Sequence, residues 1–180
     1  MKSKPLFLLI TAIAVLLAGC NTLNSSPGAA AAKQEPITPS GKADNSSCPV
    51  TQPPQDPFIP PEPWPAEPPD EGQFWFGQDG LWTALPRDGS WRQLALGEKF
   101  WWWSEEFNVS EDATPDLQVT AERLDGKAAA YRTTEATNGF HPSFNWAMLA
   151  GVELPSPGCW QFTGEYKGQQ LSFVLWAPAE

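Results

Sequence analysis

Residues 159–177 read CWQFTGEYKGQQLSFVLWA, and this stretch decides the fold class. Its first half alternates aromatic residues with polar or small ones, which is typical of a strand with one buried face. The aromatic side chains that share this face are Trp160, Phe162 and Tyr166. Lys167-Gly168 supplies a tight turn, and residues 171–177 are apolar on both faces. We therefore expect a β-hairpin whose last strand is central in its sheet or covered by another segment.

Upstream of this hairpin, short apolar runs alternate with turn-forming sequences such as Arg87-Asp88-Gly89 and Leu124-Asp125-Gly126. No stretch has a sustained helical stripe, and residues 143–149 are the one candidate for a single helical turn. The expected strands are residues 73–76, 81–85, 99–104, 117–124, 128–133, 147–154, 159–166 and 171–177. Their number and spacing predict an all-β sandwich.

Composition divides the chain into parts. Among its 180 residues, the 20 prolines are concentrated early and the 10 tryptophans late. The expected parts are a cleaved signal peptide (1–19), a flexible stalk (20–47), a proline-rich extended segment (48–71) and the β-sandwich domain (72–180). Phe58, Ile59 and Trp64 are apolar residues of the proline-rich segment. We expect them to lie against the folded domain, with a role as a partner's ligand as the alternative.

Residues 1–20, MKSKPLFLLITAIAVLLAGC, have the pattern of a signal peptide, because two lysines precede an apolar run that is too short for a membrane span. The tetrapeptide LAGC at 17–20 resembles the lipobox of bacterial lipoproteins, in which the cysteine sulfur carries the lipid. We therefore expect an acylated Cys20 to anchor the chain in a lipid bilayer. The expected location is the bacterial cell membrane or an outer membrane, on the extracytoplasmic side. The alternative is an ordinary secretory signal with a chance cysteine.

Lipidation of Cys20 leaves Cys48 and Cys159 in an oxidising compartment. An even pair predicts one disulfide, which would stabilise the fold by about 4 to 5 kcal/mol in the chain-entropy model. Two free thiols are the alternative.

The formal net charge of −10 argues against nucleic acid as a partner and against binding to anionic lipid head groups. The chain has no phosphate-binding loop and no dinucleotide fingerprint, so we expect no cofactor. We also expect no metal site, because two cysteines and the single His141 fall short of the four ligands that structural zinc requires.

Several segments carry a resemblance to a known group. They are CPVTQPP at 48–54, LQVTAERLDG at 117–126, LPSPGCWQFTG at 154–164 and LSFVLW at 171–176. Together they resemble an uncharacterised group of secreted bacterial proteins and lipoproteins, over most of residues 48–180. The resemblance implies an immunoglobulin-like sandwich of about seven or eight strands and supports the pairing of Cys48 with Cys159. It implies no activity and no catalytic residues.

Residues 100–106, FWWWSEE, are the strongest candidate for a binding surface. In a strand Trp101 and Trp103 share one face and Trp102 takes the other. Exposed tryptophans beside carboxylates commonly hold sugars, so Trp101 and Trp103 are a candidate binding platform. The favoured alternative is that these rings fill the core or hold the proline-rich segment.

Catalytic chemistry has weaker support. Glu105-Glu106 and Glu111-Asp112 are paired carboxylates, as a glycosidase needs, but solvated loop charge is the favoured interpretation. No Asp-x-Asp-x-Asp-Gly loop for calcium occurs between Glu105 and Asp116. His141 is the one natural general base near neutral pH, but no nucleophile motif accompanies it and a place in a surface loop is expected.

These observations predict a membrane-anchored bacterial lipoprotein whose immunoglobulin-like domain is not an enzyme and binds a protein partner or an envelope glycan. The alternative is a glycan or peptide hydrolase that uses the carboxylates between Glu105 and Asp116.

Overall fold

The structure is a computed structural model that describes residues 45–78, 80–91, 99–133 and 135–179. All described residues belong to one compact unit, residues 40–180. The predictions for the signal peptide, for Cys20 and for most of the stalk lie outside the described residues.

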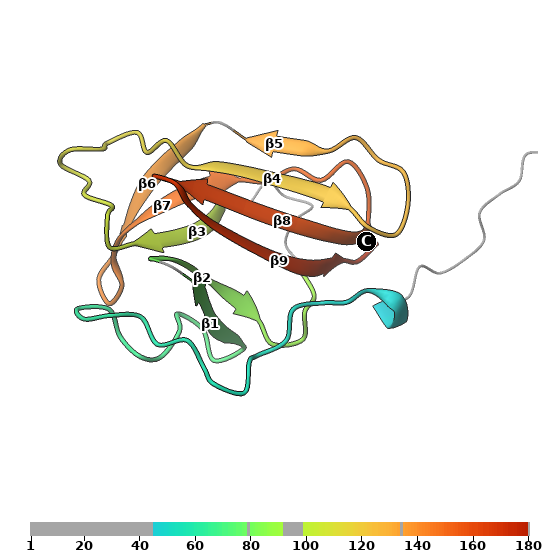
Figure 1. Ribbon diagram of the computed structural model, residues 1–180, viewed down its shortest axis with the longest axis horizontal. Helices are drawn as coiled ribbons and strands as arrows, with labels where there is room; N and C mark the ends of the chain where they lie inside the picture. The colour runs from blue at the N-terminus through green and yellow to red at the C-terminus, as the bar shows by residue number, and fades with distance from the viewer. Residues whose placement is uncertain (1–44, 79, 92–98, 134, 180) are drawn as a thin grey trace, which may run out of the picture. The chain divides into compact units, whose positions relative to one another are not determined.

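The described residues form two antiparallel sheets (Figure 1). The first sheet has the strand order β1 (Gln73–Gln78), β2 (Leu81–Pro86), β3 (Lys99–Ser104), β7 (Asn145–Gly151) and β6 (Ala136–His141). The second sheet has the order β5 (Tyr131–Thr133), β4 (Gln118–Arg123), β8 (Gly158–Tyr166) and β9 (Gln169–Ala177). A short 3-10 helix, η1 (Asn45–Ser47), precedes them.

This strand order is that of an immunoglobulin-like sandwich. The series β2-β3-β7-β6 corresponds to the A-B-E-D sheet of that fold, and β5-β4-β8-β9 corresponds to its second sheet, C′-C-F-G. β1 is an additional strand at the edge of the first sheet. The predicted all-β sandwich is therefore confirmed, with nine strands among the described residues.

One strand was missed. β6 covers Ala136–His141, ATNGFH, where Asn138-Gly139 indicates a turn when the sequence is read alone. The structure pairs all six residues with β7 instead, and the turn between the two strands follows at residues 142–144. The single helical turn expected within residues 143–149 is therefore wrong, because residues 143 and 144 belong to the turn between the strands and residues 145–149 belong to β7. His141 is the last residue of β6 and does not lie in the loop that was expected.

The core between the sheets contains the aromatic face predicted for the last hairpin. Trp160, Phe162 and Tyr166 on β8 are each at most 1% exposed. The Trp102 ring of β3 packs against the second sheet at Gly164, where an added Cβ would lie 2.4 Å from ring atoms of Trp102. The side-chain alternation of both strands therefore places their large rings in one core.

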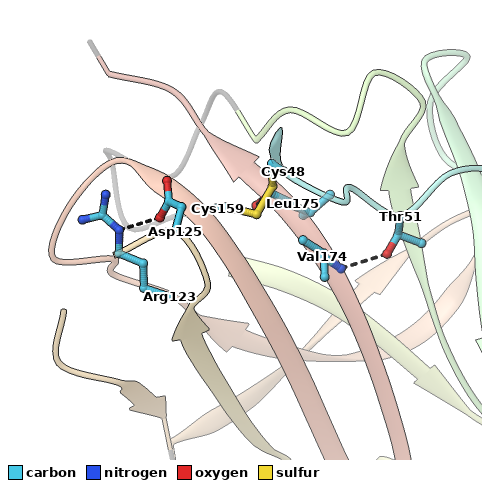
Figure 2. The surroundings of a disulfide bond; sticks show 7 residues. All are labelled: Cys48, Thr51, Arg123, Asp125, Cys159, Val174 and Leu175. Carbon is cyan, nitrogen blue, oxygen red and sulfur yellow. Dashed lines mark hydrogen bonds and ion pairs between the residues drawn. A yellow bond between two sulfur atoms is a disulfide. The ribbon is translucent and has the colours of Figure 1, made fainter. Parts of the chain in front are cut away.

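The last strand, β9, is an edge strand that another segment covers. The backbone N–H of Thr51 donates to the Val174 carbonyl at 2.8 Å, and the Val174 N–H donates to Thr51 Oγ1 at 2.8 Å (Figure 2). Further along, Trp91 N–H donates to the Trp176 carbonyl and Trp176 N–H donates to the Gly89 carbonyl, each at 2.8 Å. These bonds satisfy backbone groups at the open edge of β9, so the strand is covered rather than central. On its outer face Ser172 is exposed, Val174 is half-buried and Trp176 is buried.

The proline-rich segment, residues 48–71, is called the strap below. Its first residue, Cys48, forms the predicted disulfide with Cys159 of β8, with a Cα–Cα distance of 5.5 Å (Figure 2). The alternative of two free thiols is thereby wrong. Farther along, Trp64 packs edge-on against Trp82 of β2, with ring centroids 4.9 Å apart. Ile59, which was expected to pack, is 65% exposed.

Candidate functional site

A second aromatic cluster lies on the outer face of the first sheet, away from the core between the sheets. As the alternation predicts, Trp102 of β3 lies in the core between the sheets, and Trp101 and Trp103 belong to the outer cluster. The buried members of the outer cluster are Trp75, Trp82, Trp103, Phe144 and Ala147, with Phe58, Trp64, Ala84 and Trp101 packed against them. The strap and the β6–β7 turn thus cover part of a face that tryptophans dominate.

The register of the strands leaves a hollow on this face. Trp75 of β1 pairs with Ala84 of β2. Thr83 pairs with Trp102 of β3, so the next step along both strands brings Ala84 beside Trp101. Ala84 therefore stands between two indole rings, and its methyl group fills far less space than they do.

A groove of about 760 Å³ occupies this position. Ala84 lines it together with aromatic side chains from β3 and the β6–β7 turn, namely Trp101, Trp103 and Phe144. The end of the strap contributes Pro69 and Asp70 to its wall. The polar side chains around it are Asp70, Gln73, Arg87, Asp88, Ser90, Lys99 and His141. An aromatic floor with polar groups at its rim is the usual composition of a site for a small ligand.

The two predicted platform residues differ in burial. Trp103 is 1% exposed and packs edge-on against Trp75, with ring centroids 5.0 Å apart. Trp101 is half-buried, and its ring lies nearly parallel to that of Trp103 at 6.0 Å. Trp101 is consequently the more accessible of the two stacked indole rings that line the groove.

The polar side chains of the groove are held in different ways. Lys99 Nζ donates to Thr137 Oγ1 at 2.8 Å, and Asp88 Oδ1 accepts from the Ser90 N–H at 2.9 Å. His141 Nδ1 accepts from the Ser143 N–H at 3.2 Å, so the proton of the neutral ring lies on Nε2. Gln73 Oε1 is buried and has no hydrogen-bond partner among the described residues. This amide oxygen is a buried acceptor whose hydrogen-bonding capacity is unused within the described residues.

The carboxylates singled out as catalytic candidates lie elsewhere. Glu105, Glu106 and Glu111 are exposed residues of the β3–β4 loop. Asp112 accepts a hydrogen bond from the Tyr166 hydroxyl at 2.8 Å, and burial together with this bond raises the pKa of Tyr166 above its ordinary value. None of these carboxylates lines the groove. The structure therefore gives Asp112 a structural partner and leaves the other three solvated.

Sequence reasoning singled out Trp101 and His141 but missed Ala84, Gln73 and the end of the strap. Ala84 and Gln73 carry no signal of their own, because their importance depends on the register of β1, β2 and β3. Comparison of the chain with protein-family models, with curated sequences and with solved structures found no match. The resemblance to secreted bacterial proteins and lipoproteins therefore remains a prediction.

Within residues 45–78, 80–91, 99–133 and 135–179, no three His, Cys, Asp or Glu side chains gather to hold a metal ion. Within the same ranges, no helix has the length and apolar character to cross a membrane.

Proposed function

We propose that this chain is a lipid-anchored bacterial lipoprotein whose immunoglobulin-like domain binds an envelope glycan in the groove beside Trp101. In this proposal Cys20 carries the lipid, the stalk extends the domain away from the bilayer, and the domain binds without catalysing a reaction.

The observation that carries the proposal is the half-buried Trp101 ring beside the small Ala84. A sugar ring has one face of C–H groups, which stacks on an indole ring, and a rim of hydroxyl groups, which need polar partners. The groove offers both, because Gln73, Asp70 and Lys99 stand around the aromatic floor.

Two features of the scaffold support binding rather than turnover. The floor of the groove rests on the outer cluster, in which Trp75, Trp82 and Trp103 are at most 3% exposed, so Trp101 is held before the ligand arrives. The paired carboxylates of the β3–β4 loop are not among the residues that line the groove.

The test is binding of the purified full chain to a glycan array and to cell-wall fragments, followed by tryptophan fluorescence. We expect a saturable signal that Trp101→Ala lowers at least about tenfold, equivalent to about 1.4 kcal/mol. Leu124→Ala is the control, because Leu124 is 46% exposed and does not line the groove. Silence across all glycans, with a protein partner recovered instead, would contradict the proposal.

The same fragments test the hydrolase alternative. Glu105→Gln and Glu111→Gln should leave binding unchanged, and no soluble fragments should be released. Release of fragments that both substitutions abolish would replace the binding proposal with the hydrolase.

A further inference from the structure

β6 leaves one edge of the first sheet open. It pairs with β7 only, and no second strand among the described residues pairs with its far edge. The Asn138 side chain donates to the Ala113 carbonyl of the β3–β4 loop, so this loop contacts β6 through a side chain and not through a backbone ladder. The other sheet edges differ. β9 is covered by the strap, β5 is only three residues long, and β1 lies against β9 through Phe76 and Phe173, whose centroids are 6.3 Å apart.

β6 also lacks the features that usually protect an edge strand. Its sequence, ATNGFH, contains no proline, no lysine and no carboxylate. Phe140 is 56% exposed and lies 5.4 Å from the Trp146 ring on β7, which is itself 39% exposed. An open edge beside two exposed aromatic rings is a surface suited to pairing with another strand.

We propose that the strand that pairs with β6 is β6 of a second copy of this chain. In such an antiparallel pair, a two-fold axis runs perpendicular to the sheet and keeps each side chain on its own face. Residues directly opposite each other must point to the same face. The axis therefore has to pass midway between one residue and the same residue of the partner. An axis at Asn138 uses the length of β6 best, because it pairs residues 135 to 141 with their counterparts in reverse order.

Size and charge favour this register. Ala136 stands opposite the partner's Phe140, and Thr137 stands opposite the partner's Gly139, so a small residue faces a larger one at each step. Glu135 stands opposite the partner's His141. Because His141 Nδ1 already accepts from Ser143, its Nε2–H is the donor that the Glu135 carboxylate can bind without any change of protonation.

The dimer would join two five-stranded sheets into one continuous sheet. The axis is perpendicular to that sheet, so both outer faces, and both grooves, would point in the same direction. If the proposed glycan binding is correct, one polymer could engage both grooves and bind with higher avidity than either groove provides. The pairing itself does not depend on glycan binding.

The register is tested by a single cysteine on the axis. In the full chain, Asn138→Cys places two thiols opposite each other at a Cα separation of about 4.5 to 5.5 Å, which a disulfide can bridge. We expect a reducible dimer on mild oxidation. Glu122→Cys, at an exposed position of β4, is the control and should remain monomeric. Equal cross-linking of both variants, or a monomeric Asn138→Cys whose thiol reacts with a maleimide, would overturn the proposal.

A second variant tests the interface without a new thiol. Phe140→Lys places a charge on β6 at the edge that would pair with the partner. It also removes the ring that would face the partner's Ala136. Light scattering of the purified full chain should show a dimer whose dissociation constant rises at least about tenfold in this variant. A wild-type chain that stays monomeric at high concentration would overturn the dimer and leave the glycan proposal untouched, because groove binding is measured separately.

Discussion

Gly164 of β8 lies directly opposite the Trp102 ring of β3 in the core between the sheets. A Cβ at position 164 would stand 2.4 Å from two atoms of the Trp102 ring, a distance that no side chain can occupy. Trp102, the tryptophan of β3 that lies in the core between the sheets, therefore depends on the absence of a side chain on the opposite sheet.

Gly164→Ala should destabilise the domain by about 1 to 3 kcal/mol, because the Trp102 ring or one of the sheets has to shift. Gly151→Ala is the matched control. It lies in β7, and its added Cβ would meet nothing within 4 Å. Urea denaturation of both variants measures the difference, and an unchanged midpoint for Gly164→Ala would show that the core is more yielding than the structure indicates.

Trp101 and Trp103 should separate binding from stability. Trp103→Ala removes a ring that is 1% exposed, so the free energy of unfolding should fall by about 3 to 5 kcal/mol. Trp101→Ala should cost clearly less, because its ring is only half-buried, while glycan binding is lost. Chemical denaturation combined with glycan titration checks both effects. Equal losses of stability would assign both rings to the scaffold.

The disulfide should hold the strap in place. Mass spectrometry of an unreduced digest should detect a peptide that joins Cys48 to Cys159. Replacing both cysteines with serine should lower the free energy of unfolding by about 2 to 5 kcal/mol, since the bridge closes a long loop. Trp64 and Trp82 fluorescence should shift to longer wavelength if the strap detaches. Two alkylatable thiols at these positions in the purified, unreduced protein would contradict the linkage.

Tyr166 should make the fold sensitive to alkali. Burial and the hydrogen bond to Asp112 raise its folded pKa above the ordinary 10.0, so the folded state keeps the proton that the unfolded state releases. The contribution of this proton is complete below pH 10 and is lost as the pH rises above it. Tyr166→Phe should flatten the fall of stability above pH 10, as measured by the denaturation midpoint at several pH values. An unchanged slope would place the titrating group elsewhere.

Much of the fold could be predicted from the sequence because its signals are local. Alternation in residues 159–177 and in 99–104 identified strands and faces correctly, and turn residues located most of the boundaries. β6 was missed because Asn138-Gly139 is a strong turn signal that pairing with β7 outweighs. Such pairing joins segments through tertiary contacts, which a local pattern does not contain.

The candidate site was less predictable for the same reason. The alternation separated Trp102 from its neighbours, but the burial of Trp103 depends on Trp75 and Phe144, which come from other elements. The hollow at Ala84 exists only once the register of β1, β2 and β3 is known. That Ala84 lies between two tryptophan rings can be recognised only when the pairing of β1, β2 and β3 is known.

The disulfide also determines where mechanical load enters the domain. Cys48 precedes the rest of the strap, and its covalent partner Cys159 lies in β8, which has β4 on one side and β9 on the other. A pull on the chain before Cys48 therefore passes into a strand held by two ladders of hydrogen bonds. The strap and β1, which follow Cys48 in sequence, are shielded from that tension and are not peeled from the sheet. The described domain can accordingly remain folded when tension is applied to the chain before Cys48.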